Sequence, residues 1–288
     1  MHIPVLQKEV LQYLDPKPNE NFIDCTVGGG GHTFSIFEKI SPKGKILAID
    51  ADQEVIKILK SEKSGKGIVF VCDNYANLKE IVKKCKFRPV RGILLDLGLS
   101  SWDLEKSGRG FSFKKNEPLD MRYSLENKFP AEKIINFWSK FDIEKILREY
   151  GEERKSEHIA REIIEKRKIK PIKTTWQLRE IINRTGTSPQ RSFQALRIAV
   201  NDELNNLKNA LPQVLEILKP GGRLVVISFH SLEERIVKDF YKSKLQAPSA
   251  NLKILTKKPV TPTDEEIKIN SRSRSAKLRA AEKLPIKL

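Results

Sequence analysis

The chain has 288 residues, enough for one large α/β domain or a domain with an insert, and the absence of a signal-like N-terminal segment or a run of about 18 apolar residues predicts a cytoplasmic protein with no membrane partner. Its 54 Lys and Arg residues against 37 Asp and Glu residues give a net charge of +17, which favours nucleic acid as a partner, although a solvated lysine-rich surface would give the same balance. Cys25, Cys72 and Cys85 have neither C-x-x-C spacing nor a histidine cluster nearby, which argues against a metal site and a disulfide framework.

The first functional signal is a predicted strand, glycine turn and helix over residues 21–40. An apolar run ends at Asp24, and four consecutive glycines at 28–31 precede the helical pattern. Glycines allow positive φ and close backbone approach, and a helix N-terminus attracts anions. A dinucleotide G-x-G-x-x-G motif is not formed, because Thr33 takes the place of the last glycine. The acid before the glycines instead suits the ammonium group of S-adenosylmethionine, while a tight turn without a ligand is the alternative.

Three further apolar runs, at residues 45–50, 67–72 and 90–96, predict parallel strands of a doubly wound sheet. Asp50 ends the second strand and is expected to bind ribose hydroxyls, although it could simply cap the next helix. Tyr75 follows the third strand and could stack on adenine or pack in the core. Asp96 ends the fourth strand, which we expect at the centre of the sheet.

The strand–helix alternation stops after the fourth strand, and helix-forming, charged segments follow. We therefore predict a sheet-containing domain formed by residues 1–104 and 201–288, which the family resemblance described below implies to be a methyltransferase domain, and a helical, substrate-recognising insert at 105–200. A long helix is expected over 192–218 and a fifth strand over 223–229. The basic tail is expected to end in an edge strand.

The predicted chemistry is methyl transfer to an exocyclic base amine, which requires no metal because a sulfonium donor is already activated. Such an amine is a poor nucleophile, and a carboxylate that accepts its N–H bonds would stabilise the developing positive charge. Asp96 is the candidate for this role, with an N-cap as the alternative. Phe229 and His230, after the fifth strand, could hold an extruded base, with His230 as a second catalytic candidate. Ser231 and Glu234 form the pattern of a capping box.

Arginines with aromatic or hydroxyl neighbours are the candidate RNA contacts. Such mixtures suit phosphate contact and base stacking, although each arginine could equally be a solvated or salt-bridged surface group. The candidate substrate-binding arginines are Arg109, Arg122, Arg191, Arg272 and Arg274.

Eight segments together resemble the bacterial 16S ribosomal RNA cytosine-N4 methyltransferase family, RsmH/MraW. They run in order along nearly the whole chain and are HIPVL (2–6), DCTVGGGGH (24–32), DLGLSS (96–101), RGFSF (109–113), PLDMR (118–122), SFQALRI (192–198), ISFHSLE (227–233) and RSRS (272–275).

The resemblance implies a class I (Rossmann-like) methyltransferase sheet with a helical insert, S-adenosylmethionine as donor, and a decoding-region cytidine of 16S ribosomal RNA, in the small subunit or an assembly intermediate, as acceptor. The cofactor contacts that it implies, together with those suggested by the glycine turn, are Asp24, Gly28, Gly30, Gly31, His32, Asp50, Tyr75, Asp96 and Asp103.

Two positions depart from the family pattern. Asp103 stands where the family usually has Gln, which implies an altered cofactor or substrate contact, and Glu117 replaces a common glycine before Pro118. Two other functions remain as alternatives: a methyltransferase acting on DNA or protein, and a non-catalytic RNA-binding assembly factor. The motif typical of DNA amino-methylases is absent after the fourth strand, and the acids expected in a working site are retained.

Overall fold

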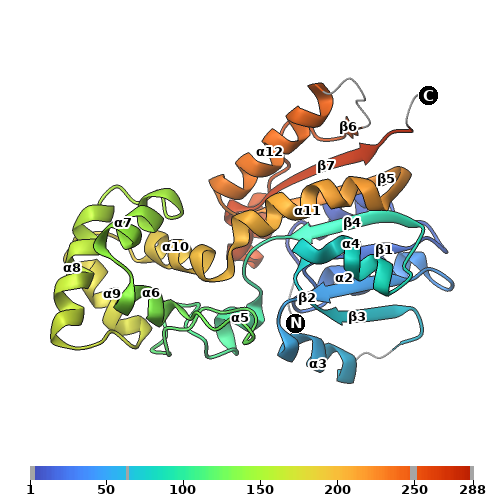
Figure 1. Ribbon diagram of the computed structural model, residues 1–288. Coiled ribbons are helices and arrows are strands. Elements are labelled where there is room, and N and C mark those ends of the chain that lie inside the picture. The colour runs from blue at the N-terminus through green and yellow to red at the C-terminus, as the bar shows by residue number, and fades with distance from the viewer. Residues whose placement is uncertain (1–3, 63–64, 247–251, 286–288) are drawn as a thin grey trace. The chain divides into compact units, whose positions relative to one another are not determined.

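The computed structural model describes residues 4–62, 65–246 and 252–285, so the first two residues of the HIPVL motif lie outside the described residues. The chain divides into two compact units, residues 1–98 with 204–288 and residues 99–203 (Figure 1). The second unit therefore begins six residues earlier and ends three residues later than the insert expected at 105–200.

The first unit contains a seven-stranded sheet in the order β3-β2-β1-β4-β5-β7-β6, with β4 at its centre as expected. Strands β1 to β5 are parallel, whereas β7 is antiparallel to both β5 and β6. The two edge strands are β3 and β6, so the last strand of the chain, β7, is not at an edge, which corrects the expectation for the tail. The strands are β1 (Phe22–Asp24), β2 (Ile46–Asp50), β3 (Ile68–Cys72), β4 (Val90–Asp96), β5 (Leu218–Ser228), β6 (Leu252–Ile254) and β7 (Lys277–Lys283).

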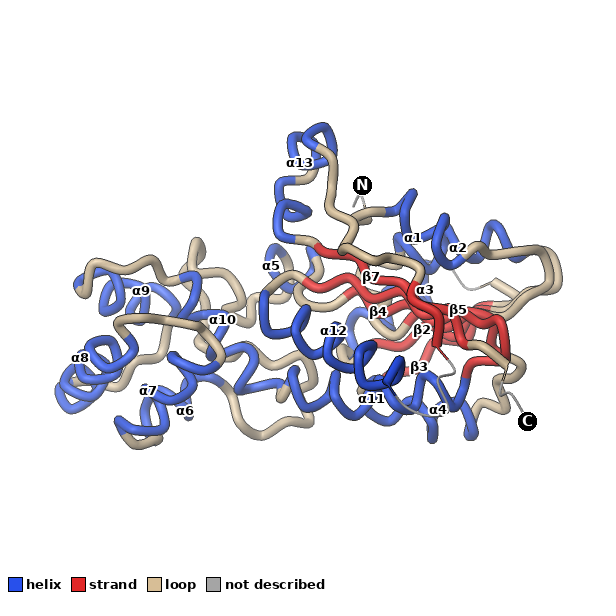
Figure 2. The backbone as a smooth tube through the Cα atoms, turned by 90° about the horizontal axis from the view of Figure 1, so that it is seen from above, coloured by secondary structure: helices blue, strands red, loops and turns tan. Residues whose placement is uncertain are grey.

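Helices cover both faces of this sheet, as Figure 2 shows for α1 and α2 on one side and α4, α11 and α12 on the other. Successive strand residues point to opposite faces, so Phe22 and Leu94 join one hydrophobic cluster while Ile23 and Ile93 join the other. The first unit's helices and 3₁₀ turns are α1 (Gln7–Leu14), α2 (Gly31–Ile40), α3 (Gln53–Glu62), η1 (Tyr75–Asn77), α4 (Leu78–Lys84), α11 (Glu203–Ile217), α12 (Ser231–Gln246), α13 (Asp264–Ile269) and η2 (Ser271–Ser275).

The long helix expected over 192–218 is two helices in the structure. Asp202 adopts a left-handed conformation, with φ of 49°, between α10 and α11. Asp tolerates this conformation better than most residues because its short side chain can bond locally. The boundary between the two units falls at this break.

The second unit is helical, as the sequence predicts, and has its own hydrophobic core. In α7, for example, Ile143, Ile146 and Leu147 recur at helical spacing and are buried. Its helices are α5 (Ser101–Glu105), α6 (Ala131–Phe137), α7 (Lys140–Glu149), α8 (Ser156–Ile169), α9 (Thr175–Arg184) and α10 (Gln190–Asn201). Among all helices in the described stretches, none combines the length and apolar character needed to cross a bilayer.

Candidate functional site

Three acids end three neighbouring strands at the carboxyl edge of the sheet. Asp50 ends β2, Asp24 ends β1 and Asp96 ends β4, and these strands are adjacent in the order β2-β1-β4. Doubly wound sheets bind ligands at this edge. The structure thus brings together the acids that the sequence singled out.

The glycine turn is shaped by one of these acids. The Gly28 N–H donates to Asp50 Oδ2 at 2.9 Å, and the Asp52 N–H donates to Asp50 Oδ1 at 2.9 Å. Gly30 has φ of 78° and precedes the first helical residue, Gly31. A Cβ on Gly31 would lie 2.3 Å from Pro4 Cγ, so a side chain does not fit there.

The N-terminus of α2 is open to an anion. Among the described residues no side chain caps this helix, and the first N–H groups of a helix have no acceptor within it. The positive end of the helix dipole adds to the attraction for a negative group. A carboxylate is the kind of group that this end of α2 can bind.

Asp24 is 1% exposed, and each of its carboxylate oxygens accepts a hydrogen bond from a neighbouring residue. Its Oδ2 accepts from Thr33 Oγ1 at 2.6 Å and its Oδ1 accepts from the Thr26 N–H at 3.1 Å. Burial raises the pKa of the Asp24 carboxyl, and the bond from Thr33 opposes that rise. Asp24 therefore fits a positioning role better than direct contact with a ligand.

Two threonines that the sequence analysis did not select hold the acids in place. Thr33 ties α2 to the end of β1 through Asp24, and Thr26 Oγ1 accepts from the Asp96 N–H at 2.7 Å, tying β1 to β4. A threonine nine residues after an acid carries no local signal, because the two meet only when α2 folds back onto the sheet.

His32 and Asp96 form a buried pair beside the glycine turn. His32 Nε2 lies 3.5 Å from Asp96 Oδ2, with the imidazole 7% and the carboxylate side chain 22% exposed. Burial opposes a charge on the imidazole, but the carboxylates of Asp96 and Asp24 outweigh it and raise the pKa of His32.

Within the described chain, Oδ1 of Asp96 is buried and lacks a hydrogen-bond partner, whereas Oδ2 faces His32. Buried polar atoms are nearly always paired in native proteins, so this oxygen indicates a place for a polar ligand.

Phe229 and His230 follow β5 at the same edge. The Leu97 N–H donates to the Ile227 carbonyl at 3.0 Å, and a Cβ added to Gly98 would lie 3.6 Å from Phe229 Cδ2. The structure therefore places Phe229 beside the segment that follows Asp96, and its role in holding a base stays a prediction.

His230 is tied to the start of α12. Its Nε2 lies 3.1 Å from Glu233 Oε1, and the Glu233 N–H donates to His230 Nδ1 at 3.4 Å. The predicted capping box of Ser231 with Glu234 is wrong, because the Glu234 carboxylate pairs with Arg279. His230 has a structural function in this arrangement, and a catalytic one stays a hypothesis.

Tyr75 begins η1 and is partly buried against the core, and its stacking on adenine stays a prediction. Asp103 lies in the second unit, where its Oδ2 accepts from Ser100 N–H at 2.8 Å and from Ser100 Oγ at 2.6 Å. The reciprocal bond from the Asp103 N–H completes a capping box for α5. This carboxylate therefore has a local structural role whether or not it also contacts a ligand.

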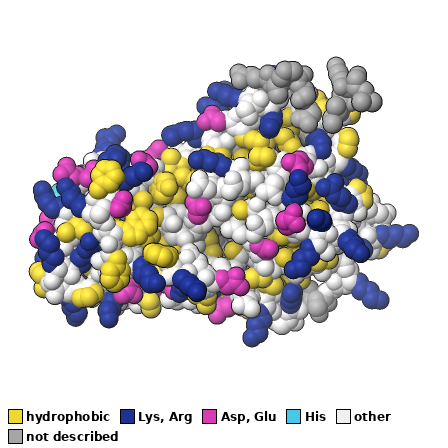
Figure 3. Space-filling view, viewed as in Figure 1, with side chains coloured by type: hydrophobic (Ala, Val, Ile, Leu, Met, Phe, Trp, Pro, Cys, Tyr) yellow, Lys and Arg dark blue, Asp and Glu magenta, His cyan; other side chains and the backbone are white. Residues whose placement is uncertain are grey.

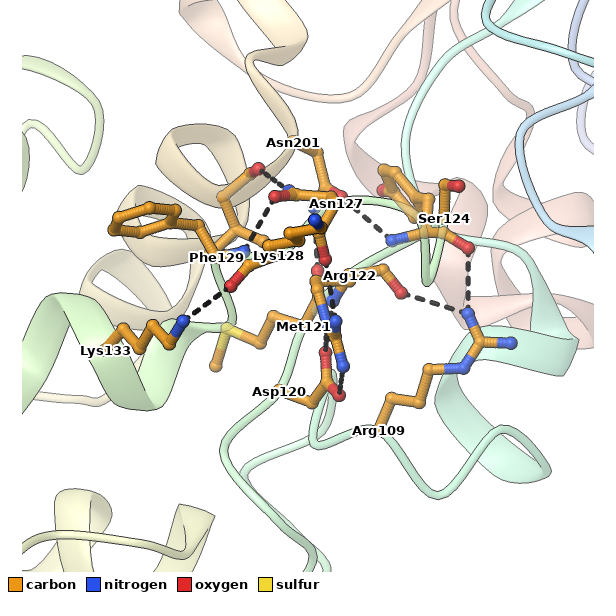
Figure 4. Close-up of polar contacts among 12 residues, drawn as sticks. Arg109, Asp120, Met121, Arg122, Ser124, Asn127, Lys128, Phe129, Lys133 and Asn201 are labelled. Atoms are coloured by element: carbon orange, nitrogen blue, oxygen red, sulfur yellow. Dashed lines mark hydrogen bonds and ion pairs between the residues drawn. The ribbon is translucent and has the colours of Figure 1, made fainter.

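Arg109 and Arg122 use their guanidinium groups to hold a loop of the second unit (Figure 4). Arg109 Nη1 donates to the carbonyls of Arg122 and Tyr123 at 3.0 and 2.8 Å. Arg122 forms a two-point pair with Asp120 at 2.6 and 2.7 Å, which raises the pKa of its guanidinium. Both guanidinium groups thus have partners within this loop, as the salt-bridged alternative requires, and their binding to RNA stays a prediction.

The remaining candidate arginines belong to different units. Arg191, in the second unit, is exposed and donates from Nη1 to the Glu152 carbonyl at 3.1 Å. Arg272 and Arg274, in the first unit, lie on η2, where Arg274 is exposed and Arg272 half-buried.

Comparison with known proteins relates the chain to one family. It matches the MraW methylase family over residues 1–284. It is 45% identical to a Ribosomal RNA small subunit methyltransferase H from Caldicellulosiruptor saccharolyticus, over 98% of this chain and 99% of that protein. Proteins of the same name from Dehalococcoides mccartyi and Clostridium botulinum are 43% and 42% identical, each over 98% of this chain and over 86% and 99% of their own lengths.

Among solved structures, that of PH0851 superposes with a TM-score of 0.51 at 17% identity, over 98% of this chain and 47% of the other. This likeness concerns the fold alone. The strand order and the family match together confirm the class I methyltransferase sheet with a helical insert that the sequence resemblance implied.

Proposed function

The chain belongs to the MraW methylase family, and we propose that it transfers a methyl group from S-adenosylmethionine to the exocyclic N4 amine of a cytidine in the decoding region of 16S ribosomal RNA. The names of its relatives, which refer to the small ribosomal subunit, support an RNA acceptor. The net charge of +17 supports a polyanionic one.

The observation that carries the proposal is the buried His32–Asp96 pair, whose Asp96 Oδ1 has no hydrogen-bond partner among the described residues, beside the N-terminus of α2. The residues that would hold the donor are His32, Asp50, Asp96, the backbone of Gly28, Gly30 and Gly31, and Tyr75 as a stacking surface for adenine. When bound, the donor supplies a methyl group on a positively charged sulfur.

We assign the acceptor chemistry to Asp96. Its carboxylate would accept the N–H bonds of the amine, which restores lone-pair density on nitrogen and stabilises the positive charge that develops there. His32 lies beside it, and the raised pKa of His32 favours a positively charged imidazolium next to the Asp96 carboxylate. Methyl transfer to the amine requires alignment of donor and acceptor and stabilisation of the developing charge. The chain would contribute by positioning Asp96 and the donor in a site away from water.

The base itself would be held by Phe229, which lies next to Gly98, two residues after the end of β4. An enzyme that modifies a base inside a folded RNA extrudes it and stacks it between apolar side chains. Arg191, Arg272 and Arg274 are proposed as contacts to RNA phosphates. The reaction would take place in the cytoplasm, on the small subunit or an assembly intermediate.

Transfer of labelled methyl from S-adenosylmethionine to three acceptors tests the proposal. We expect label on small ribosomal subunits or their assembly intermediates, less on naked 16S ribosomal RNA and none on duplex DNA. Label on DNA, or none on any RNA although the donor binds, would contradict it. Calorimetric titration of the donor alone separates a failed donor site from a wrong acceptor.

A further inference from the structure

The second unit exposes large hydrophobic side chains next to a strongly basic segment. Phe137 at the end of α6 is 79% exposed, Phe141 at the start of α7 is 66% exposed, and Ile169 at the end of α8 is 82% exposed. Residues 166–173 contain five Lys or Arg and no acid. We call the surface formed by Phe137, Phe141 and residues 166–173 the basic–aromatic surface.

Hydrogen bonds place the end of α6, which carries Phe137, beside residues 166–173, and Phe141 lies four residues after Phe137 in the first turn of α7. Asn136 makes two bonds to Ile172, from its Nδ2 to the carbonyl at 2.8 Å and from the Ile172 N–H to its Oδ1 at 2.9 Å. Arg167 Nη1 donates to the Ile135 carbonyl at 2.7 Å. The end of α6 is thus held against the end of α8 by specific contacts.

The two exposed rings do not serve the core of this unit. Ile134 and Ile135 of α6 and Ile143 of α7 are the buried members of their helices, whereas Phe137 and Phe141 fall outside that pattern. Figure 3 shows hydrophobic side chains interspersed with Lys and Arg over the face of this unit. Neighbouring exposed hydrophobic side chains of this size mark a surface that binds a partner.

The acidic residues near the basic–aromatic surface leave its lysine side chains available to bind phosphate groups. Lys168 pairs with Glu165 at 2.8 Å and Lys140 pairs with Glu157 at 3.0 Å, and all four side chains are well exposed. Exposed pairs of this kind contribute little and exchange readily for other partners. Asp142, beside Phe141, accepts from the Ser139 hydroxyl that caps α7.

We propose that the basic–aromatic surface binds an unpaired segment of the ribosomal RNA substrate, with bases stacked on Phe137 and Phe141 and phosphates held by Lys168 and Lys170. The inference rests on the proposed function and adds a binding surface for RNA in the second unit. Cations interleaved with exposed rings suit single-stranded RNA, because every base offers a flat face and every linkage a negative charge.

Affinity for a fluorescent single-stranded RNA and for naked 16S ribosomal RNA, measured by anisotropy, tests the rings. The Phe137→Ala/Phe141→Ala variant should bind about 10-fold more weakly for each ring that stacks on a base. Methylation should show a raised KM with an unchanged kcat. Leu125→Ala, at a residue of the same unit that is 58% exposed, serves as the matched control and should change neither value.

The salt dependence of binding tests the cations separately. Lys168→Gln/Lys170→Gln should reduce the slope of log affinity against log salt by about 1.4, since each phosphate contact to a single strand contributes about 0.7. Lys57→Gln/Lys60→Gln removes two exposed charges from α3 and should leave the slope unchanged. A slope that falls equally in both variants would mean that only the overall charge matters, which would overturn the assignment.

The outcomes separate this inference from the proposed function. If the unmodified protein transfers no methyl to RNA, the proposed function fails, whereas the binding measurements still decide the surface. If the protein methylates RNA while both ring and lysine variants keep wild-type affinity and KM, the inference fails alone. Loss of binding to assembled subunits but not to naked RNA would identify a ribosomal protein as the partner and would also overturn it.

Discussion

Removing the Thr33 hydroxyl tests how the candidate site is held together. Thr33→Val keeps the shape of a side chain that is 0% exposed but deletes the 2.6 Å bond to Asp24 Oδ2. A hydrogen bond to a charged group contributes roughly 1.5–3 kcal/mol, so we expect a loss of about 2 kcal/mol in the free energy of unfolding at pH 8. With a slope of about 2 kcal/mol per molar urea, the unfolding midpoint should fall by about 1 M.

The pH dependence of this loss has a definite sign. Burial raises the pKa of Asp24 above its ordinary value of 3.8, and the Thr33 bond opposes that rise by favouring the ionised form. The variant therefore raises the folded-state pKa further. The penalty is complete at alkaline pH and shrinks as the pH falls through the folded-state pKa, where the carboxyl is protonated in both proteins.

Urea unfolding followed by tryptophan fluorescence and circular dichroism between pH 5 and pH 8 provides the measurement. Thr261→Val, at an exposed position of the same unit, is the control and should change stability by less than about 0.5 kcal/mol. A Thr33→Val penalty no larger than that of the control, or one that grows towards acid pH, would refute the reasoning about Asp24.

Three further predictions concern the site. Asp96→Ala should leave RNA affinity within about twofold and abolish methyl transfer, as anisotropy and label incorporation would show; unchanged turnover would remove Asp96 from the chemistry. The carboxylates of Asp96 and Asp24 outweigh the effect of burial and raise the pKa of His32 above its ordinary value of 6.5. The charged imidazole therefore stabilises the folded protein at low pH. The stability difference between wild type and His32→Asn should therefore shrink as the pH rises from 6 to 9, and a difference that grows would contradict the assigned direction. Gly31→Ala puts a Cβ 2.3 Å from Pro4 Cγ and should weaken donor binding at least tenfold by calorimetry, whereas Gly65→Ala, whose Cβ would meet nothing within 4 Å, should bind normally.

The parallel part of the fold follows from local sequence. Buried parallel strands read as continuous apolar runs, and the run ending at Asp50 and the run ending at Asp96 became β2 and β4. Acids at strand ends are easily recognised, because the carboxyl ends of parallel strands share one edge. The clustering of Asp24, Asp50 and Asp96 could therefore be predicted before any contact was known.

Features that depend on distant contacts could not be predicted in this way. The break at Asp202 depends on one residue in the left-handed region inside a continuous helical pattern. The position of β6 outside β7 depends on antiparallel pairing between segments about 30 residues apart. Arg109 and Arg122 resemble phosphate contacts in sequence, but loop carbonyls and Asp120 surround their guanidinium groups only after folding. The exposure of Phe137 likewise appears only once the helices pack.

The most direct test of the central claim is nucleoside analysis of ribosomal RNA methylated by this protein. Small subunits or assembly intermediates that lack the modification would be incubated with S-adenosylmethionine, and their RNA digested and analysed by mass spectrometry. We predict N4-methylcytidine at a single position of the decoding region, absent when Asp96→Ala replaces the wild type. A methyl group on carbon 5, on a ribose or on another base would contradict the assignment of Asp96 to an exocyclic amine.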